Sequence, residues 1–578
     1  MAPNGRWASK DNHCLNADFC IRICALLPSV KRIVSLVASS VSIVSYQNPD
    51  RNLRGLRRIL AAVGLCALQA ACTTSNSVAI TSPDDLRTRD LMTQTIELVA
   101  TRYIDPISRE QILVNTLDGL SSIDEDIRVD ITPDNLVLQY RDQNIDTIPF
   151  PALSDDDTGS DNMQVWAEMT LHGLASYRVY SWKLRNSSTK DVESALISGA
   201  IRNLDRYSRY ESPERAENAR NRRDGYIGVG VRVVGGNGYP VIKIVHPESP
   251  AFKAGLHPGD QILTVDGEDM YGKASRYTAD LLHGEEGSSV MVEINPAGSK
   301  AITPVEIMRE RVIDRTVFTE IRDNVLIARI SSFNSATATT LADSIRKAKL
   351  FDGGLQGVIL DLRGNRGGLL QQGVSVADLF LANGPIGKTY SRVIVARHTF
   401  KAETKDLSEG APLVILIDGR TASSAELVAA ALQDRHRAVL IGSTSFGKGS
   451  VQAINDLPND GTLTFTWSRL TAPSGYTFDR IGLFPAICTQ PNTNTSAVHQ
   501  VAQALSERDQ IASVMMKWRS LDYQDEKSRR ELRNVCPAQP NDEKIDIEIA
   551  LELIKNRREY KNLAYAGQEE IADTFAGQ

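Results

Sequence analysis

A serine and a lysine that could act as nucleophile and base lie close together in the sequence between Gly419 and Gln452. Ser423 stands in "GRTASSAEL", directly before a helical pattern, and Lys448 stands in the glycine-flanked "SFGKGS". A serine hydroxyl becomes an effective nucleophile only when a neighbouring group accepts its proton. Lysine accepts a proton only when its amine is neutral, against an ordinary pKa of about 10.4, and burial lowers that value. We therefore expect Lys448 to be desolvated.

The elements around these residues predict that Ser423 and Lys448 meet at one edge of a sheet. The strand "PLVILID" ends just before Ser423, and the strand "AVLIG" leads to Lys448. Parallel strands joined by a crossover helix end at the same edge. A helix of about twelve residues covers about 18 Å, and the returning strand covers about 17 Å. His436 follows the helix at the opposite edge, where we expect it to be part of the surface.

Three further features belong to the same edge. The strand "QGVILDL" runs into the glycine-rich "RGNRGG", whose backbone N–H groups could approach a ligand closely. With the free N–H groups at the following helix start, these donors could form an oxyanion hole, whose loss slows acyl transfer about 100- to 1000-fold. Gln452 could orient the neutral amine of Lys448, and Glu426 could cap the helix start.

Two other kinds of site fit this edge less well. Lys448 could bind phosphate, but the residue after it is glycine and the GxxxxGK[ST] spacing is missing. No GxSxG motif supports an α/β-hydrolase.

The composition is that of a globular chain of several domains. It has 578 residues, 42% of them hydrophobic, and a net charge of -6. At about 150 residues per domain, this length predicts three or four domains. The mild charge gives no indication of nucleic-acid binding, and no Cys or His spacing indicates a metal site. No cofactor is expected.

The first 72 residues have the order of an export signal. Basic residues precede a short apolar run and then "QAACTTS", which resembles a bacterial lipobox with Cys72 as the lipidated residue. A simple cleaved signal and an uncleaved anchor remain alternatives, and the true start of translation lies in doubt. Export would leave Cys488 and Cys536 free to form a disulfide in an oxidising compartment, worth about 3–4 kcal/mol. Two separate buried thiols are the alternative.

Periodicity divides the remaining chain into four regions. Residues 84–220 are expected to be a helical domain with an insertion, and residues 225–311 a small β-domain. In residues 312–487, buried strands alternate with helices, which predicts a largely parallel sheet with crossover helices. Residues 488–578 are expected to be a helical extension. The predicted class is multidomain α/β.

Three motifs in order, "LDLRGNRGGLL", "TASSAELVAAALQD" and "SFGKGSVQ", resemble those of the carboxy-terminal processing proteases. The resemblance extends to "GYIGVGV", "SPAFKAGLHPGDQILTVDG", "YIDP" and "LDRYSRYESP", over roughly Met92–Leu470 with gaps. It implies a crotonase- or Clp-like α/β protease core with a Ser-Lys dyad. Ser423 would be the nucleophile, Lys448 the general base, and Gln452 the residue that orients the lysine.

The resemblance also implies oxyanion donors, namely the backbone N–H of Ser424 and that of Gly367, with Gly368 as the neighbouring candidate. The sequence departs from the family's usual Asn-Pro-Gly-Gly, because Arg366 takes the place of the proline. A second departure is Ala486, where an aspartate is common.

Family members capture substrate C-termini with a PDZ domain, which residues 225–311 would form here. The loop "YIGVGV" would bind the terminal carboxylate through N–H groups near Gly228, Val229 and Gly230. The adjacent strand edge would then pair with the peptide by β-augmentation. Leu281 and Leu282 would line the side-chain pocket or belong to the core.

These expectations describe a periplasmic serine endopeptidase, anchored by lipid to the bacterial outer membrane, that cleaves unstructured C-terminal tails. An activating or adaptor lipoprotein and self-association are left open as partnerships. Membrane contact is expected through the lipid anchor at most. The alternative function is a catalytically silent PDZ adaptor that binds tails or a partner lipoprotein. A lipid- or retinoid-binding relative of the same fold would need an enlarged apolar pocket.

Overall fold

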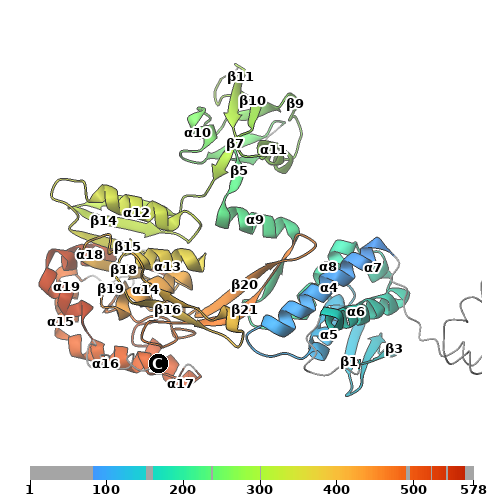
Figure 1. The fold of residues 1–578 in the computed structure, drawn as a ribbon. Helices are drawn as coiled ribbons and strands as arrows, with labels where there is room; N and C mark the ends of the chain where they lie inside the picture. Colours follow the sequence, from blue (N-terminus) through green and yellow to red (C-terminus); the bar gives the residue numbers. More distant parts are fainter. Residues whose placement is uncertain are drawn as a thin grey trace, which may run out of the picture. The chain divides into compact units, whose positions relative to one another are not determined.

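The computed structural model describes residues 82–151, 160–235, 238–299, 301–489, 495–522, 524–541 and 544–566 (Figure 1). The expected export segment 1–72, with Cys72, lies outside the described residues. In these ranges no helix is both long and apolar enough to cross a membrane. The predicted multidomain α/β class is confirmed, with a helical region, a small β-domain, a core of mixed strands and helices, and C-terminal helices.

The N-terminal region is built from helices, several of which are capped by serine. They are α4 (Pro83–Arg102), α5 (Arg109–Asp118), η1 (Gly119–Ser122), α6 (Ser160–Tyr180), α7 (Trp182–Arg185) and α8 (Thr189–Ile201). The hydroxyls of Ser82, Ser108 and Ser188 accept first-turn N–H groups, and such caps contribute about 1 kcal/mol each. Between α5 and α6, strands β1 (Ile127–Ile131), β2 (Asn135–Tyr140) and β3 (Gln143–Pro149) form an antiparallel sheet.

The chain then contributes a strand to the α/β core before it forms the β-domain. Strand β4 (Arg209–Glu211) pairs antiparallel with β21 (Thr462–Thr471). Helix α9 (Pro213–Asp224) follows and ends at Gly225, which has φ +81°. A Cβ at Gly225 would lie 2.6 Å from the carbonyl oxygen of Val312, so this turn requires glycine.

The β-domain contains a five-stranded path of antiparallel strands, in the order β11-β10-β8-β7-β6. Its elements are β5 (Tyr226–Gly228), β6 (Val231–Val234), β7 (Val241–Val245), α10 (Pro250–Lys253), β8 (Gln261–Val265), β9 (Glu268–Asp269), α11 (Ser275–Leu282), β10 (Ser289–Asn295), β11 (Thr303–Met308) and β12 (Glu310–Val312). Strands β5 and β12 pair with each other where the chain enters and leaves this domain.

The main sheet of the core has the order β13-β14-β15-β18-β19-β22 and is parallel from β14 onward. Its elements are β13 (Val317–Arg322), β14 (Val325–Ile330), α12 (Thr337–Ala348), β15 (Gly357–Asp361), α13 (Leu370–Asp378), β18 (Leu413–Ile417), α14 (Ser424–Asp434), β19 (Val439–Gly442) and β22 (Ile487–Cys488). Residues of β15 and β18 are buried on both faces, as expected when helices cover both sides of a parallel sheet.

Alternate residues of the strands contribute to two separate hydrophobic cores. Ile415 and Ile417 pack with residues of α12, α13 and α14. Val414 and Leu416 pack instead with C-terminal helices. Those helices are α15 (Ala497–Ser506), α16 (Arg508–Arg519), α17 (Glu526–Arg533), α18 (Ile545–Lys555) and α19 (Arg557–Ala564). The C-terminal region therefore covers a face of the sheet that would otherwise expose apolar side chains.

A second sheet carries the segment that follows Lys448. Its order is β17-β16-β21-β20, with β4 added at β21. The strands are β16 (Pro385–Tyr390), β17 (Thr399–Lys401) and β20 (Ser450–Asp456), and the 3₁₀ helix η2 (Ile394–Ala396) lies between the first two. Since β20 begins two residues after Lys448, this sheet and β19 together fix the two ends of the lysine loop, residues 443–449.

Candidate active site

Ser423 lies on a sharp turn between the end of β18 and the start of α14. The buried carboxylate of Asp418 accepts the backbone N–H groups of Gly364 and Thr421, at 2.9 and 3.0 Å. The N–H of Ala422 donates to the carbonyl oxygen of Asn365 at 2.9 Å. These bonds join the serine turn to the glycine-rich loop after β15, at the predicted common edge of the sheet.

The backbone of Ser423 itself has φ +60° and ψ -123°, a conformation that L-residues rarely adopt. Such a residue costs about 1–3 kcal/mol and persists only where its surroundings fix it. The N–H of Ser423 donates to a carboxylate oxygen of Glu426 at 2.9 Å, which helps to hold this conformation. Strain of this kind at an accessible serine is a mark of functional sites.

Glu426 connects the serine turn to the lysine loop. Its side chain is fully buried and accepts N–H groups from Ser423, Gly447 and Lys448, at 2.7–2.9 Å, and the hydroxyl of Ser445. Burial raises the pKa of Glu426, and these donors oppose the rise. The expected cap is thus present, and the same carboxylate also holds the backbone of Lys448.

The amine of Lys448 lies 4.8 Å from the ring centre of Tyr207, in a cation–π arrangement. Among the described residues, its Nζ forms no hydrogen bond or ion pair. Burial lowers the pKa of Lys448, and the positive charges of Arg209 and Arg206 lower it further. The expected desolvation of the lysine is therefore present, although the contact with Tyr207 could not be foreseen from the sequence.

One cleft of about 540 Å³ is lined by Ser423, Lys448 and Gln452. In the described structure no hydrogen bond joins Ser423 Oγ to Lys448 Nζ, because the amine rests over Tyr207. The expectation that Gln452 contacts the lysine is wrong for this conformation. Its Nε2 donates to the hydroxyls of Ser450 and Thr466, at 3.0 and 3.3 Å, and a register shift of β20 lies between Val451 and Gln452.

The two candidate oxyanion donors in the glycine-rich loop, Gly367 and Gly368, differ in whether their N–H groups are free. The N–H of Gly367 donates to Oδ1 of Asn365 at 2.8 Å, so it is not a free oxyanion donor in this conformation. Gly368 is exposed, and its N–H and that of Ser424 have no hydrogen-bond acceptor among the described residues. The neighbouring candidate Gly368 therefore fits the oxyanion role better than Gly367.

Two segments of the chain match known protein families. Residues 324–488 match peptidase family S41, and residues 241–296 match a PDZ domain. The carboxy-terminal-processing protease of Bartonella bacilliformis is 36% identical over 306 residues, which cover 52% of this chain and 70% of the relative. The chloroplastic C-terminal processing peptidase of Tetradesmus obliquus is 30% identical over 363 residues, covering 57% of this chain and 76% of the relative.

The chain belongs to the carboxy-terminal processing proteases of peptidase family S41. It is a serine-type peptidase with a PDZ domain.

The PDZ domain of this protease presents an edge strand to solvent. Strand β6 pairs with β7 and, among the described strands, has no partner on its other side. The loop Gly228–Gly230 is buried, and Gly228 forms a bridge to His283 after α11. Leu282 is 3% exposed and belongs to the domain core, so the alternative of a pocket residue is wrong for it, whereas Leu281 is half-buried.

A C-terminal segment that we call the brace, residues 533–541, contacts both halves of the site. The Arg533 guanidinium donates to the carbonyl of Ser445 at 3.4 Å, and the Thr444 hydroxyl donates to the carbonyl of Cys536. The carbonyl of Gln539 accepts the N–H of Gly419 at 2.8 Å. The protease therefore fixes the serine turn and the lysine loop with residues far along the chain.

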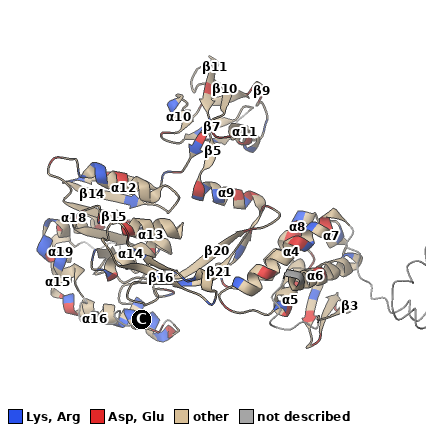
Figure 2. Ribbon diagram, in the orientation of Figure 1, with Lys and Arg blue, Asp and Glu red and all other residues tan. Residues whose placement is uncertain are grey.

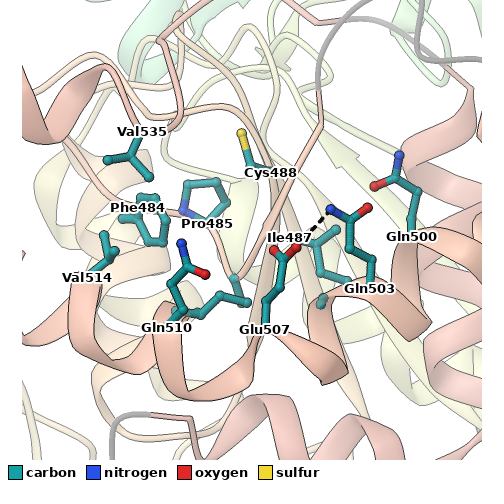
Figure 3. Close-up of a pocket in the computed structure, with 13 residues that line it drawn as sticks. Phe484, Pro485, Ile487, Cys488, Gln500, Gln503, Glu507, Gln510, Val514 and Val535 are labelled. Atoms are coloured by element: carbon teal, nitrogen blue, oxygen red, sulfur yellow. Dashed lines mark hydrogen bonds between the residues drawn. The ribbon is translucent and has the colours of Figure 1, made fainter.

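The brace is tied to the sheet by the disulfide between Cys488 and Cys536. Cys488 also borders a cavity of about 570 Å³ between β22 and the helices α15 and α16 (Figure 3). Gln503 and Glu507, which are hydrogen-bonded at 3.0 Å, line that cavity together with Phe484. It contains neither Ser423 nor Lys448, so it is separate from the cleft.

Several residues of the site were missed in the sequence. Tyr207 lies in "LDRYSRY", which the family resemblance had marked without a role. Arg363 is buried and forms ion pairs with Asp361 at 2.8 Å and with Asp546 at 3.1 Å, which joins the loop after β15 to α18.

Within the described ranges, no group of His, Cys, Asp and Glu side chains could hold a metal ion. His436 is half-buried and stacks on Tyr565 of the C-terminal region.

Proposed function

We propose that this protease hydrolyses the C-terminal tails of exported proteins, with Ser423 as nucleophile and Lys448 as general base. The observation that carries the proposal is the buried carboxylate of Glu426, which holds the backbone of both residues while their side chains line one cleft. Burial and nearby arginines lower the pKa of Lys448, which favours the neutral amine that a base requires.

In the proposed reaction, Ser423 Oγ attacks the carbonyl carbon of the scissile bond, and its proton passes to neutral Lys448 Nζ. The N–H groups of Ser424 and Gly368 bind the oxyanion that forms. Lys448 then gives the proton to the leaving amine, and water hydrolyses the acyl-enzyme by the same steps. The attack requires the Lys448 side chain to rotate from Tyr207 toward Ser423, and the rotated amine is the partner proposed for Gln452.

The dyad is tested by replacing each member. The wild-type protein should degrade an unstructured substrate such as casein, and Ser423→Ala and Lys448→Ala should each lose at least about 1000-fold in rate. Lys448→Arg should also fail, because a guanidinium stays protonated. Lys555→Ala, an exposed lysine on α18, is the control and should keep full activity. Equal degradation by all variants would reject the dyad.

The alternative function, a catalytically silent PDZ adaptor, would give a different result. It would bind peptide tails, but the wild-type protein would cleave none of them.

We propose that the tail carboxylate binds at Gly228–Gly230 while the peptide pairs with β6, supported by the free edge of that strand. Peptides with an amidated C-terminus should bind at least about tenfold more weakly than free acids.

We propose export and lipidation at Cys72 on the sequence, supported by the Cys488–Cys536 disulfide, which suits an oxidising compartment. Membrane fractionation of cells that express wild type and Cys72→Ser tests this. The wild-type protein should be recovered with membranes, and the variant should be released.

A further inference from the structure

The charged side chains that line the cleft containing Ser423 are mostly cationic. These are Arg209, Arg220, Arg222, Arg223, Arg366 and Lys448, whereas Glu211 is the carboxylate among the lining residues. Three of the arginines come from α9, which carries blue segments in Figure 2. A peptide tail in this cleft would therefore pass close to an excess of positive charge.

Some of these charges are already paired. Arg209 is 3.3 Å from Glu211, and Arg220 is 3.1 Å from Asp456. Arg223 pairs with its neighbour Asp224 at 2.8 Å. Arg222 and Arg366 are both exposed, and neither forms an ion pair or a side-chain hydrogen bond with any described residue. They are the charges in the cleft that remain available to a ligand.

Arg366 has a fixed backbone next to the reacting atoms. The buried Asn365 before it donates to the carbonyl of Ile330 at 2.8 Å and accepts the N–H of Gly367 after it. Gly367 approaches the serine so closely that a Cβ there would lie 2.8 Å from Ser423 Cβ. Arg366 directly precedes Gly367, the residue that approaches Ser423. A substrate residue beside the scissile bond must therefore lie close to the Arg366 guanidinium.

The rest of the lining shows what else the cleft accepts. Phe333, Leu369, Leu370, Val451 and Ile454 supply apolar surface around Ser423. An apolar residue at the scissile bond would bury this surface, and a carboxylate beside it would reach an unpaired guanidinium. The pKa of Lys448 is lowered by burial and by the charges of Arg209 and Arg206, and the carboxylates of Asp205 and Glu426 oppose this shift.

We propose that Arg366, assisted by Arg222, makes this protease select tails that carry an acidic residue beside an apolar cleavage site. The inference rests on the proposed function and names its substrate class. A guanidinium and a carboxylate form paired hydrogen bonds, which neutral or basic side chains cannot replace. The available charges then act against basic tails as well as in favour of acidic ones.

The test compares three peptides with one apolar cleavage site and one C-terminus, carrying Glu, Gln or Lys on both sides of that site. For the full chain, kcat/KM should fall from Glu to Gln to Lys, by about fivefold at each step, as an exposed ion pair can supply. The ratio between the Glu and Lys peptides should shrink as salt is raised, because screening weakens exposed charge pairs.

Charge reversal assigns the preference to its residue. Arg366→Glu should invert the order of the three peptides, and Arg366→Gln should bring the three rates close together. Arg222→Glu, away from the glycine-rich loop, should reduce the ratio without inverting it. Arg558→Glu, on an exposed part of α19, should keep the wild-type order. Each ratio is taken within one protein, so a partly folded variant does not distort it.

Two results would overturn this inference while leaving the peptidase in place. One is equal kcat/KM for all three peptides under Ser423-dependent cleavage. The other is an Arg366→Glu variant that keeps the wild-type order. Absence of any Ser423-dependent cleavage would reject the proposed function itself, and the inference with it.

Discussion

The serine turn and the lysine loop reach the same cleft by different means. The carboxylates of Asp418 and Glu426, close to Ser423 in sequence, accept N–H groups of its turn, and Asn365 of the glycine-rich loop accepts the N–H of Ala422. Residues 443–449 have no regular secondary structure and depend on Glu426 and on the brace. The difference teaches that the proposed nucleophile is positioned by carboxylates of its own turn as well as by distant segments, whereas the loop of the proposed base depends on residues distant in sequence.

Outside the dyad itself, the largest effect should come from Glu426, which contacts both the serine turn and the lysine loop. Glu426→Ala leaves several buried donors without an acceptor, at about 1–3 kcal/mol each. We expect kcat to fall at least about 100-fold and the thermal midpoint to fall with it. Glu426→Gln keeps the volume but loses acceptor capacity, so it should fall between wild type and Ala. Near-normal activity of Glu426→Ala would show that Glu426 does not connect the serine turn to the lysine loop.

Substitution of Gly367, which has φ +94°, should disturb the serine turn alone. A Cβ there would lie 2.8 Å from Ser423 Cβ and 2.9 Å from the carbonyl oxygen of Ala422. We expect Gly367→Ala to lower kcat about 10- to 100-fold through displacement of Ser423. Gly364→Ala is the control, since Gly364 has φ +75° but nothing closer than 3.7 Å to the added carbon. Equal losses in both variants would assign the effect to backbone strain alone.

Substitution of Arg533 should disturb the lysine loop alone. Its guanidinium donates to the carbonyls of Ser445 and Ile481. We expect Arg533→Ala to lower kcat about tenfold, because the loop that carries Lys448 gains freedom. Arg530→Ala, exposed on the same helix, should be close to wild type. Similar steady-state rates for the two variants would show that the brace does not position the base.

The smallest effect should be a shift in pH dependence. A base works above its pKa, so activity should rise with pH through the pKa of Lys448. Because burial lowers that pKa, the rise should be centred below the ordinary value of about 10.4. Arg209→Gln removes a nearby positive charge, so its profile of kcat/KM should shift upward by a few tenths of a unit. A downward shift would contradict this account of the site.

The contrast also explains what the sequence could predict. Strand ends of a parallel sheet meet at one edge, so the common cleft of Ser423 and Lys448 followed from alternation of strands and helices. The contact of Gln452 with the lysine did not follow, because a register shift in β20 adjoins that residue. The side chain of Asn365 captures the N–H of Gly367, a local competition that the glycines alone do not reveal.

Contacts between segments distant in sequence could not be predicted from the sequence. Nothing in the periodicity of residues 84–220 indicates that β4 joins β21, or that Tyr207 then lies under Lys448. The polar pattern of the last ninety residues predicted helices, which the structure contains. Their coverage of one sheet face and the path of the brace depend on tertiary packing, which local patterns do not encode.

The brace lies beyond residues 324–488, which match peptidase family S41, yet it contacts both parts of the proposed site. A recombinant fragment ending at Cys488, where the family match stops, would retain Ser423 and Lys448. It would lose Arg533, Cys536 and Gln539, and uncover the apolar side of β15 and β18. Synthesis of the chain therefore completes the proposed catalytic machinery only when its final helices have emerged, long after Ser423 and Lys448 have been made.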